Sequence, residues 1–480
     1  MSAGIVWLRR DLRLADHPAL TAACRTQERV LPVYVHSPRE EAPWAAGAAG
    51  RWWLHHSLQA LEESLAKRGG QLHLAAGETL PVLCRLIEQT GAGAIHWTRC
   101  YEPAAMARDA RIESTLRARG VAVQIHAGNL WFEPGQISGA ERQPYRVFTP
   151  FWRRAAARLP TPAPLAQARP RAWLRLPGSL PLAALGLEPR HPWTLGLART
   201  WRPGEKGARQ ALARFGEGGA ADYARRRDRP ACAGTSRLSP HLHFGEITPC
   251  QILHALRRRL DPAECGAQAD LEAYLRQLGW REFAYHLLHH FPGIGERNFD
   301  RRFDAFPWIE PDEARFDRWR RGRTGVPLVD AGMRELWSTG WMHNRVRMIV
   351  ASFLSKNLRL HWLHGARWFW DTLVDADLAN NTLGWQWVAG CGPDAAPYFR
   401  VFNPYTQAAR FDPEARYLRR WLPELAALPA VLLLEPWRDP AALRRCGYPP
   451  PMLDLGASRR AALAAFGALA PNRAAGGSPG

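Results

Sequence analysis

The pattern of apolar residues changes once along the chain, and this change most constrains the fold. In the first third, short apolar runs alternate with segments of helical periodicity. The runs cover residues 5–8, 30–35, 72–74, 94–97 and 121–125. Strands that alternate with helices form a parallel sheet covered on both faces. The pattern predicts an α/β domain with a parallel, Rossmann-like sheet over residues 1–130.

One of the intervening helices is marked by leucines. Leu54, Leu58, Leu61 and Leu65 step by four, three and four residues and share one apolar face. No GxGxxG motif follows any of the strands, so an ordinary dinucleotide site is not supported.

A proline-rich stretch follows the α/β pattern. Eight prolines stand between Pro160 and Pro192, where they interrupt both helices and strand ladders, and they predict a linker over residues 131–200. From about Trp201 onward, helical signals dominate, such as Thr248 and Pro249 at the start of a helix. We therefore predict a large all-α domain over residues 201–470, followed by a disordered tail over 471–480.

The charge balance favours a polyanionic partner. Lys and Arg number 64 against 44 Asp and Glu, a formal charge of +20. Nearly all of this positive charge is arginine, which could equally reflect the base composition of the genome. Eight cysteines contain no CxxC pair, so neither a zinc module nor a disulfide framework is indicated. With no signal peptide and no apolar run of ~18 residues, the chain is expected in the cytoplasm and off the membrane.

One predicted helix, near residues 270–290, combines an aromatic ring with polar groups. Tyr274, Gln277, Trp280 and Arg281 fall on one stripe. This set is typical of a surface that holds an unstacked base near a phosphate. Taken alone, the helix fits an ordinary core aromatic beside a surface arginine better.

Two further segments carry polar groups among large side chains. A helix through residues 341–348 would point Asn344 and Met348 the same way, although a methionine there could simply fill a gap. Residues 368–387 place acids and amides among aromatics, and Arg347 is a candidate partner for a buried Asp375. Asp375 and Asp377 lack a third ligand, so no metal site is predicted.

A loop over residues 235–239 carries three hydroxyls and an arginine. Thr235, Ser236 and Ser239 flank Arg237 and closely spaced backbone amides. Such a loop can cradle a pyrophosphate, but it is also a common way to cap a helix.

Taken together, these motifs resemble those of the photolyase/cryptochrome family. The resemblance runs through residues 6–14, 234–239, 280–283, 340–345 and 375–387, in the family's order. Residues 335–337 and 369–373 also look like plant cryptochromes and the related class III bacterial photolyases. Class I and class III placement both remain open.

The resemblance implies FAD, held in the helical domain by a defined set of residues. The matching positions are Tyr223, Thr235, Ser236, Arg237, Leu238, Ser239, Tyr274, Arg347, Asp375, Ala376, Asp377 and Asn381. Asn381 matches the position that faces flavin N5.

The implied activity is that of a deoxyribodipyrimidine photo-lyase, a carbon–carbon lyase. Excited reduced FAD would donate an electron to a cyclobutane pyrimidine dimer flipped out of DNA. Trp280 would stack on the lesion, with Asn344, Met348 and Gln277 around it and Asn381 at the flavin. The partner is damaged DNA, bound by a monomer. The implied DNA contacts are Arg227, Gln277, Trp280, Arg281, Asn344, Arg345, Arg400 and Gln407.

Two further features follow from the resemblance. Trp385, Trp362 and Trp308 match the chain that carries electrons from the surface to oxidised flavin. The N-terminal domain would hold a light-harvesting antenna, 5,10-methenyltetrahydrofolate or an 8-hydroxy-deazaflavin, and Glu102 matches a folate contact. We expect folate.

Two related activities are alternatives. A cryptochrome photoreceptor is favoured by the plant-like segments, but plant cryptochromes carry aspartate where this chain has Asn381. Repair enzymes for (6-4) photoproducts carry histidines at the positions of Asn344 and Met348. Gln277 departs from the glutamate common in dimer photolyases.

Overall fold

The computed structural model describes residues 2–139, 141, 143–159, 163–189, 193–260, 266–395, 399–435 and 438–469. The chain forms two compact units, each made of several stretches. Unit 1 comprises Met1–Arg225, Thr235–Pro292 and Asp371–Ala379, and unit 2 comprises Arg226–Gly234, Gly293–Trp370 and Asn380–Gly480. The domain boundaries inferred from the sequence stay predictions, and the tail over 471–480 lies outside the described residues.

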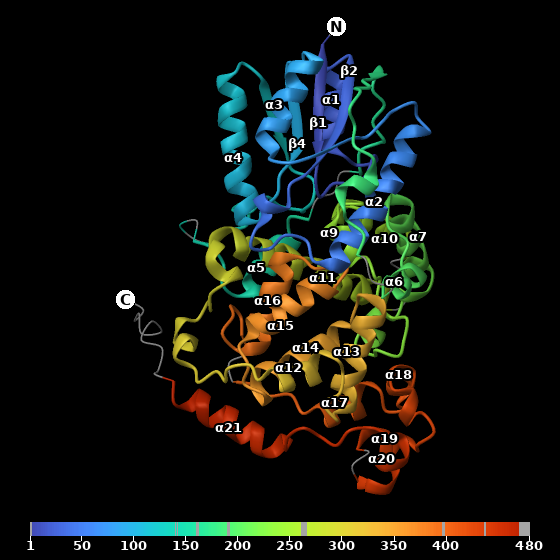
Figure 1. Ribbon diagram of the computed structural model, residues 1–480, viewed down its shortest axis with the longest axis vertical. Coiled ribbons are helices and arrows are strands. Elements are labelled where there is room, and N and C mark those ends of the chain that lie inside the picture. The colour runs from blue at the N-terminus through green and yellow to red at the C-terminus, as the bar shows by residue number, and fades with distance from the viewer. Residues whose placement is uncertain are drawn as a thin grey trace. The chain divides into compact units, whose positions relative to one another are not determined.

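Unit 1 contains a parallel sheet in the order β3-β2-β1-β4-β5, of which Figure 1 labels β2, β1 and β4. Its strands are β1 (Ala3–Leu8), β2 (Arg29–His36), β3 (His73–Ala76), β4 (Ala94–Thr98) and β5 (Ala122–His126). They coincide with the five predicted runs. The chain leaves β1 first in one direction and then in the other, which is the order of a Rossmann-like sheet. The predicted α/β fold is confirmed.

A sixth strand joins this sheet from inside the proline-rich stretch. β6 (Ala172–Trp173) pairs with the first two residues of β2, and the neighbouring Leu174 N–H donates to the carbonyl of Val30 at 2.9 Å. The prolines flank this short pairing without interrupting it, because it needs only two residues. The sequence analysis did not predict β6.

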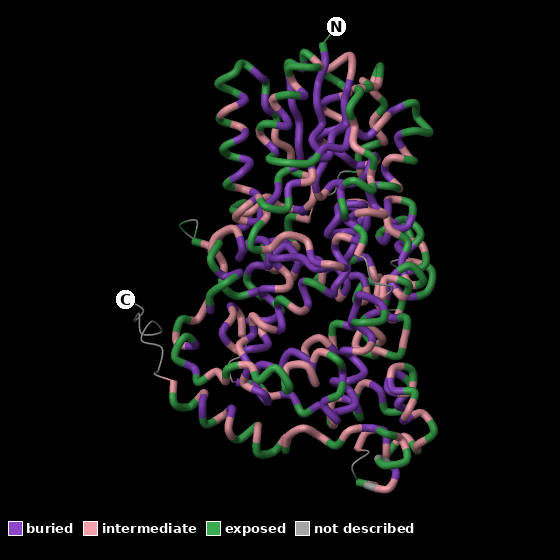
Figure 2. Tube along the Cα trace, in the orientation of Figure 1, coloured by how far each residue is buried: buried purple, intermediate pink, exposed green. Residues whose placement is uncertain are grey.

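Helices pack on the sheet and bury its strands. α1 (Pro18–Thr26), α3 (Thr79–Thr90) and α4 (Pro103–Ala118) pack against strands, and every residue of β1 is buried (Figure 2). In α2 (Ala48–Ala66), the four predicted leucines are all buried. Burying a leucine contributes roughly 1.5–3 kcal/mol, so this stripe is what holds α2 in place.

The remaining helices of unit 1 build a second core. They are α5 (Phe148–Ala156), α6 (Thr194–Thr200), α7 (Glu205–Arg214), α8 (Tyr223–Arg226, which ends one residue into unit 2), α9 (Ser239–His243), α10 (Pro249–Arg259) and α11 (Ala267–His290). Thr248 caps α10, because its side chain accepts from the Gln251 N–H while Gln251 reaches back, and Pro249 occupies the first turn. This helix start was predicted correctly.

The regular structure described for unit 2 is helical, apart from an isolated bridge between Ile309 and Leu360. Its helices are α12 (Glu313–Arg320), α13 (Pro327–Thr339), α14 (Asn344–Ser352), α15 (Trp362–Thr372), α16 (Leu378–Ala389), α17 (Pro404–Phe411), α18 (Arg416–Trp421), α19 (Ala430–Leu434), α20 (Pro440–Cys446) and α21 (Leu455–Gly467). α15 ends and α16 begins with residues of unit 1. None of the helices that the structure describes has the length and apolarity needed to cross a bilayer.

The single helix predicted through residues 341–348 is wrong at its start. α13 stops because Gly340 adopts a left-handed φ of 67°. α14 then begins only at Asn344, since the His343 side chain caps it by accepting from the Arg345 N–H at 3.2 Å. Trp341 and Met342 therefore lie between two helices.

A buried lysine follows α14 in unit 2. Lys356 stands in a π-helical turn (Phe353–Asn357) and is 3% exposed. Its Nζ donates to the carbonyl of Arg400 at 2.6 Å and lies 4.1 Å from the Phe399 ring centre. Burial lowers the pKa of Lys356 to about 7. The lysine fixes the backbone of a predicted DNA-contact residue.

Replacing Lys356 by methionine should change how stability depends on pH. Below its folded pKa the buried ammonium costs free energy, and this cost is relieved as pH rises towards the ordinary value of 10.5. The free energy of unfolding of wild type minus Lys356→Met should therefore increase by about 3 kcal/mol between pH 6 and 9.5. Denaturant titrations measure it. The exposed Lys206→Met is the control and should show no such trend.

Candidate functional site

The predicted pyrophosphate loop of unit 1 is tied to other predicted flavin contacts. The Tyr274 hydroxyl lies 3.0 Å from Oγ of Ser236, and Ser239 Oγ donates to Oδ2 of Asp375 at 2.6 Å. Tyr223 packs edge-on against Tyr274 with ring centres 5.2 Å apart. Residues separated by more than 130 positions thus meet in one polar cluster.

The backbone of this loop suits an anion. Arg237 has a left-handed φ of 53°, and Leu238 after it is right-handed helical. Alternation of this kind turns successive N–H groups towards one point and forms a nest for phosphate oxygens. The Arg237 guanidinium lies 5.7 Å from the Trp201 ring centre. Hydroxyls, a cation and a nest together fit the pyrophosphate of FAD.

Asp377 stands two residues after Asp375 in the sequence. Its side chain is buried, as is Ala376 between the two acids. Its Oδ2 accepts from the Tyr285 hydroxyl at 2.5 Å and lies 3.2 Å from Nδ1 of His243. Burial alone would raise the pKa of Asp377, yet these partners and the charge of Arg281 hold it well below its ordinary value. Asp377 is a buried, ionised carboxylate.

On α11, Trp280 is one member of an aromatic stack. Its ring lies 3.7 Å from that of Phe148 with planes 9° apart, and Trp152 stacks on Phe148 at 6.2 Å. One face of Trp280 is therefore covered, while the side chain remains half-exposed. Gln277, one turn earlier, donates to the carbonyl of Ala273 at 3.4 Å.

The Arg281 side chain is buried and is not exposed at the surface. Its Nη1 donates to the carbonyl of Asn129 at 2.8 Å, and its guanidinium lies 5.0 Å from the Tyr285 ring centre. The DNA contact of Arg281 stays a prediction, because these partners already occupy the side chain.

On α14 in unit 2, the predicted lesion contacts point the same way. Nδ2 of the exposed Asn344 lies 4.0 Å from Sδ of Met348. Arg345 pairs with Asp228 at 2.8 Å, and Arg347 Nε donates to the carbonyl of Met342 at 2.7 Å. This helix therefore carries an amide, a thioether and an arginine held by an ion pair.

The remaining predicted DNA contacts of unit 2 lie near the surface. Arg227 and Gln407 are half-buried and Arg400 is exposed. Arg347 and Asp375 belong to different units, so their pairing stays a prediction.

The predicted electron chain runs through unit 2. Trp308 lies 5.0 Å from the His361 ring, which lies 5.6 Å from Trp362, measured between ring centres. Nε1 of the fully buried Trp362 donates to Asn298 at 2.8 Å. On α16, Trp385 is one turn from Asn381, whose Nδ2 donates to the carbonyl of Ala366 in α15 at 3.0 Å. The spacing of these tryptophans in the sequence could not show that the His361 ring lies between Trp308 and Trp362.

A glycine on α15 makes room for Trp385. A Cβ at Gly365 would lie 2.1 Å from Cη2 of Trp385, so the indole rests on the helix backbone three residues from Trp362. Only glycine allows this approach.

Gly365→Ala should displace Trp385. We expect a loss of about 1–3 kcal/mol in stability from overpacking, and at least ten-fold slower photoreduction of oxidised flavin, because electron transfer falls steeply with ring separation. Transient absorption measures the rate. Gly384→Ala on α16 is the matched control, since its Cβ would meet open space, and an unchanged rate in Gly365→Ala would exclude this route.

The predicted antenna residue Glu102 has an internal partner. It is 8% exposed and lies 2.8 Å from Nη1 of Arg10. Its antenna role stays a prediction.

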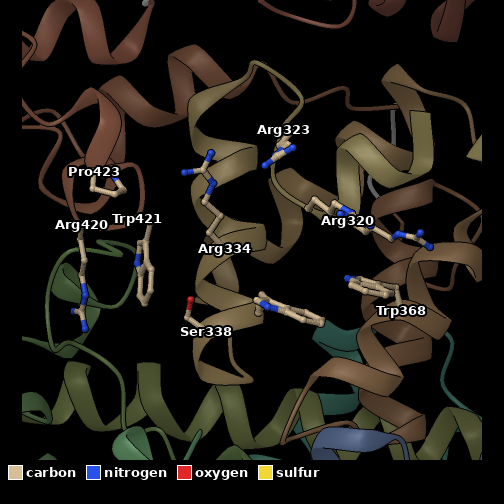
Figure 3. A pocket seen from close by; sticks show the side chains of 10 residues that line it. Arg320, Arg323, Arg334, Ser338, Trp368, Arg420, Trp421 and Pro423 are labelled. Atoms are coloured by element: carbon tan, nitrogen blue, oxygen red, sulfur yellow. The ribbon is translucent and has the colours of Figure 1, made fainter. Parts of the chain in front are cut away.

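A cavity of about 830 Å³ in unit 2 was not predicted. It is lined by Arg320, Arg321, Arg323, Arg334, Trp337, Ser338, Trp368, Arg420, Trp421 and Pro423 (Figure 3). The rings of Trp337 and Trp368 are 6.0 Å apart and 5° from parallel, and the Arg320 guanidinium lies 5.7 Å from Trp368. The lining contains five arginines and no acid. Only the similarity of residues 335–337 and 369–373 to plant cryptochromes hinted at this region.

Comparison with known proteins identifies the family of the chain. Residues 4–169 match the family model "DNA photolyase", and residues 274–468 match "FAD binding domain of DNA photolyase". A deoxyribodipyrimidine photo-lyase of Agrobacterium fabrum is 45% identical over 97% of this chain and 98% of its own. The chain belongs to the photolyase/cryptochrome family.

Other relatives show the breadth of this family. Cryptochrome-2 of Arabidopsis thaliana is 38% identical over 95% of this chain and 77% of its own length. The crystal structure of a class III photolyase from Agrobacterium tumefaciens superposes with a TM-score of 0.91 at 44% identity, covering 98% of both chains. The predicted family, fold, photolyase enzyme class and FAD-binding domain are confirmed.

Proposed function

We propose that this photolyase repairs cyclobutane pyrimidine dimers in DNA with light. The observation that carries the proposal is the common direction of Asn344 and Met348 on α14. An amide can hydrogen-bond the carbonyl and imide edges of thymine, and a thioether packs against its methyl and ring. Histidines at these positions, as in (6-4) enzymes, would supply neither an amide nor a thioether. The similarity to class III photolyases supports placement in that class.

The proposed lesion contacts from unit 1 are Trp280 and Gln277. Phe148 covers one face of Trp280, so a flipped base stacks on the other, and the backing ring keeps the indole plane fixed. Base stacking on an aromatic side chain is worth about 1–3 kcal/mol. Gln277 can donate to and accept from a base, which a carboxylate cannot do.

FAD, when bound and reduced, supplies the electron that light transfers to the lesion. Ser236, Arg237 and the nest of residues 237–238 would hold the pyrophosphate, and the Ser239 hydroxyl orients Asp375 in the same cluster. Asn381 is fixed by the Ala366 carbonyl and would offer the flavin a neutral amide, where plant cryptochromes have aspartate.

DNA is held through its phosphates by Arg227, Arg345, Arg400 and Gln407. Asp228 braces Arg345, and Lys356 anchors the backbone of Arg400. Phosphate contacts position the duplex without reading its sequence, which suits an enzyme that must act wherever a dimer forms.

Dimer-containing and (6-4)-containing oligonucleotides, illuminated with fully reduced protein, test this function. We expect restored bases only with dimers. Trp280→Ala should weaken lesion binding by about ten- to a hundred-fold, and Trp280→Phe, which keeps a ring on Phe148, should weaken it less. Repair of (6-4) lesions alone would establish the rival repair activity, and repair of neither lesion would contradict the proposed function.

The antenna chromophore is proposed to be methenyltetrahydrofolate in the cavity of unit 2. A flat pterin ring can stack on the nearly parallel Trp337 and Trp368, whose faces are apolar. Arg320, Arg321 and Arg334 already pair with Asp317 or Glu424, so Arg323 and Arg420 are the lining arginines proposed to pair with folate carboxylates. Glu102 is the rival site, but its carboxylate already neutralises Arg10. A deazaflavin remains the alternative ligand.

Removing Trp368 should release the antenna. We expect Trp368→Ala to lose the near-ultraviolet absorbance of bound folate while retaining FAD, and Glu102→Gln to keep both. Absorbance of purified protein reconstituted with folate measures this. If Glu102→Gln loses folate and Trp368→Ala keeps it, the antenna belongs to the N-terminal domain; binding of deazaflavin in place of folate would correct the ligand.

A further inference from the structure

A chain of buried polar side chains in unit 1 ends on Asp377. Arg10 Nη1 lies 2.8 Å from Oε1 of Glu102 and against the His243 ring, 3.3 Å from Nδ1 and 3.2 Å from Nε2. His243 Nδ1 also lies 3.2 Å from Oδ2 of Asp377. The Tyr285 hydroxyl donates to that same oxygen at 2.5 Å. The opening motif of the sequence is thus connected to a predicted flavin contact more than 360 residues away.

Arg10 and Asp377 together set the proton on His243. Arg10 Nη1 is almost equally close to both ring nitrogens, and a guanidinium can only donate, so one of these nitrogens must accept. A carboxylate can only accept, so Nδ1 carries the hydrogen and donates to Asp377. One neutral imidazole satisfies both requirements, and burial together with Arg10 lowers the pKa of His243, which favours this form. Nδ1 is therefore the donor to Asp377, and Nε2 is left to accept from Arg10.

The backbone around this chain is held rigidly. A Cβ at Gly245 would lie 1.9 Å from the carbonyl oxygen of Arg10, so the loop after α9 rests directly on the end of β1. The Leu12 N–H donates to the carbonyl of Phe244 at 3.1 Å, and Arg13 Nη1 donates to that of Gly245 at 2.8 Å. Arg10 and His243 thus have little freedom to move apart.

We propose that Arg10 and His243 are positioning residues of the flavin site, which keep Asp377 ionised and fixed in direction and thereby set the reduction potential of the bound flavin. The inference rests on the proposed function, because it takes Asp377 as a flavin contact. Glu102 takes part as the counter-ion of Arg10. A fixed anion beside a redox group disfavours the addition of electrons. Weakening its support should therefore make the flavin easier to reduce.

The test compares three variants by spectroelectrochemical titration of the FAD-loaded protein in the dark. His243→Leu removes both hydrogen bonds, and we expect at least a ten-fold larger equilibrium constant for two-electron reduction, an upward shift of about 30 mV. His243→Gln can still accept from Arg10 and donate to Asp377, and should restore most of the wild-type potential.

His241→Leu is the matched control. His241 lies two residues away on α9, is also buried, and bonds to Glu246 instead of Asp377. It should lower stability as His243→Leu does, without moving the potential. Should His243→Leu fail to fold, Tyr285→Phe removes another hydrogen-bond donor to Asp377 with little change of shape, and a smaller shift in the same direction is expected.

The outcomes separate this inference from the proposed function. Equal potentials in wild type and His243→Leu, in protein that binds FAD and repairs dimers, would overturn the inference alone. A shift of the same size in His241→Leu, or no rescue by glutamine, would also overturn it, because the effect would then be general loosening. Wild-type protein that binds no FAD would overturn both.

Discussion

Buried charge at the end of β1 is the constraint on which the rest of unit 1 depends. Arg13 is fully buried, and its guanidinium donates to backbone carbonyls of Asp16, Gly128 and Gly245. The Thr248 hydroxyl donates in turn to Asp16 at 2.5 Å. A buried cation whose acceptors are lost costs several kcal/mol. The sheet and the helical layer around α9 and α10 therefore cannot separate without exposing these unsatisfied groups.

Local patterns predicted most of the fold because they depend on neighbours in sequence. The five strands, the leucine face of α2 and the cap at Thr248 all follow from residues within one or two turns of each other. The misses are non-local. β6 exists because Ala172 and Trp173 meet β2, which no local pattern in the proline-rich stretch reveals. The start of α14 depended on a left-handed Gly340 and the cap at His343.

The candidate site was predicted less evenly. Its residue types came from the resemblance to photolyases, which named Asp377 but not the side chains that support it. His243 and Arg10 are separated by more than 230 residues, and nothing in either segment indicates that they meet. The Arg- and Trp-lined cavity likewise draws on three segments of unit 2. Spacing identifies a helix face, but a cluster assembled from distant segments becomes visible only once the chain is folded.

The net charge of +20 overstates how much cation is available to DNA. Arg9, Arg13 and Arg281 are buried, and each donates hydrogen bonds to carboxylates or carbonyls of unit 1. In contrast, Arg400 is exposed. Phosphate attraction is sequence-independent and grows with the number of exposed cations. If the buried arginines hold the fold and the exposed ones bind any duplex, then neither class can recognise a lesion. Discrimination must come from the few uncharged groups proposed to meet the flipped bases, which are the ring of Trp280, the amides of Gln277 and Asn344, and the thioether of Met348.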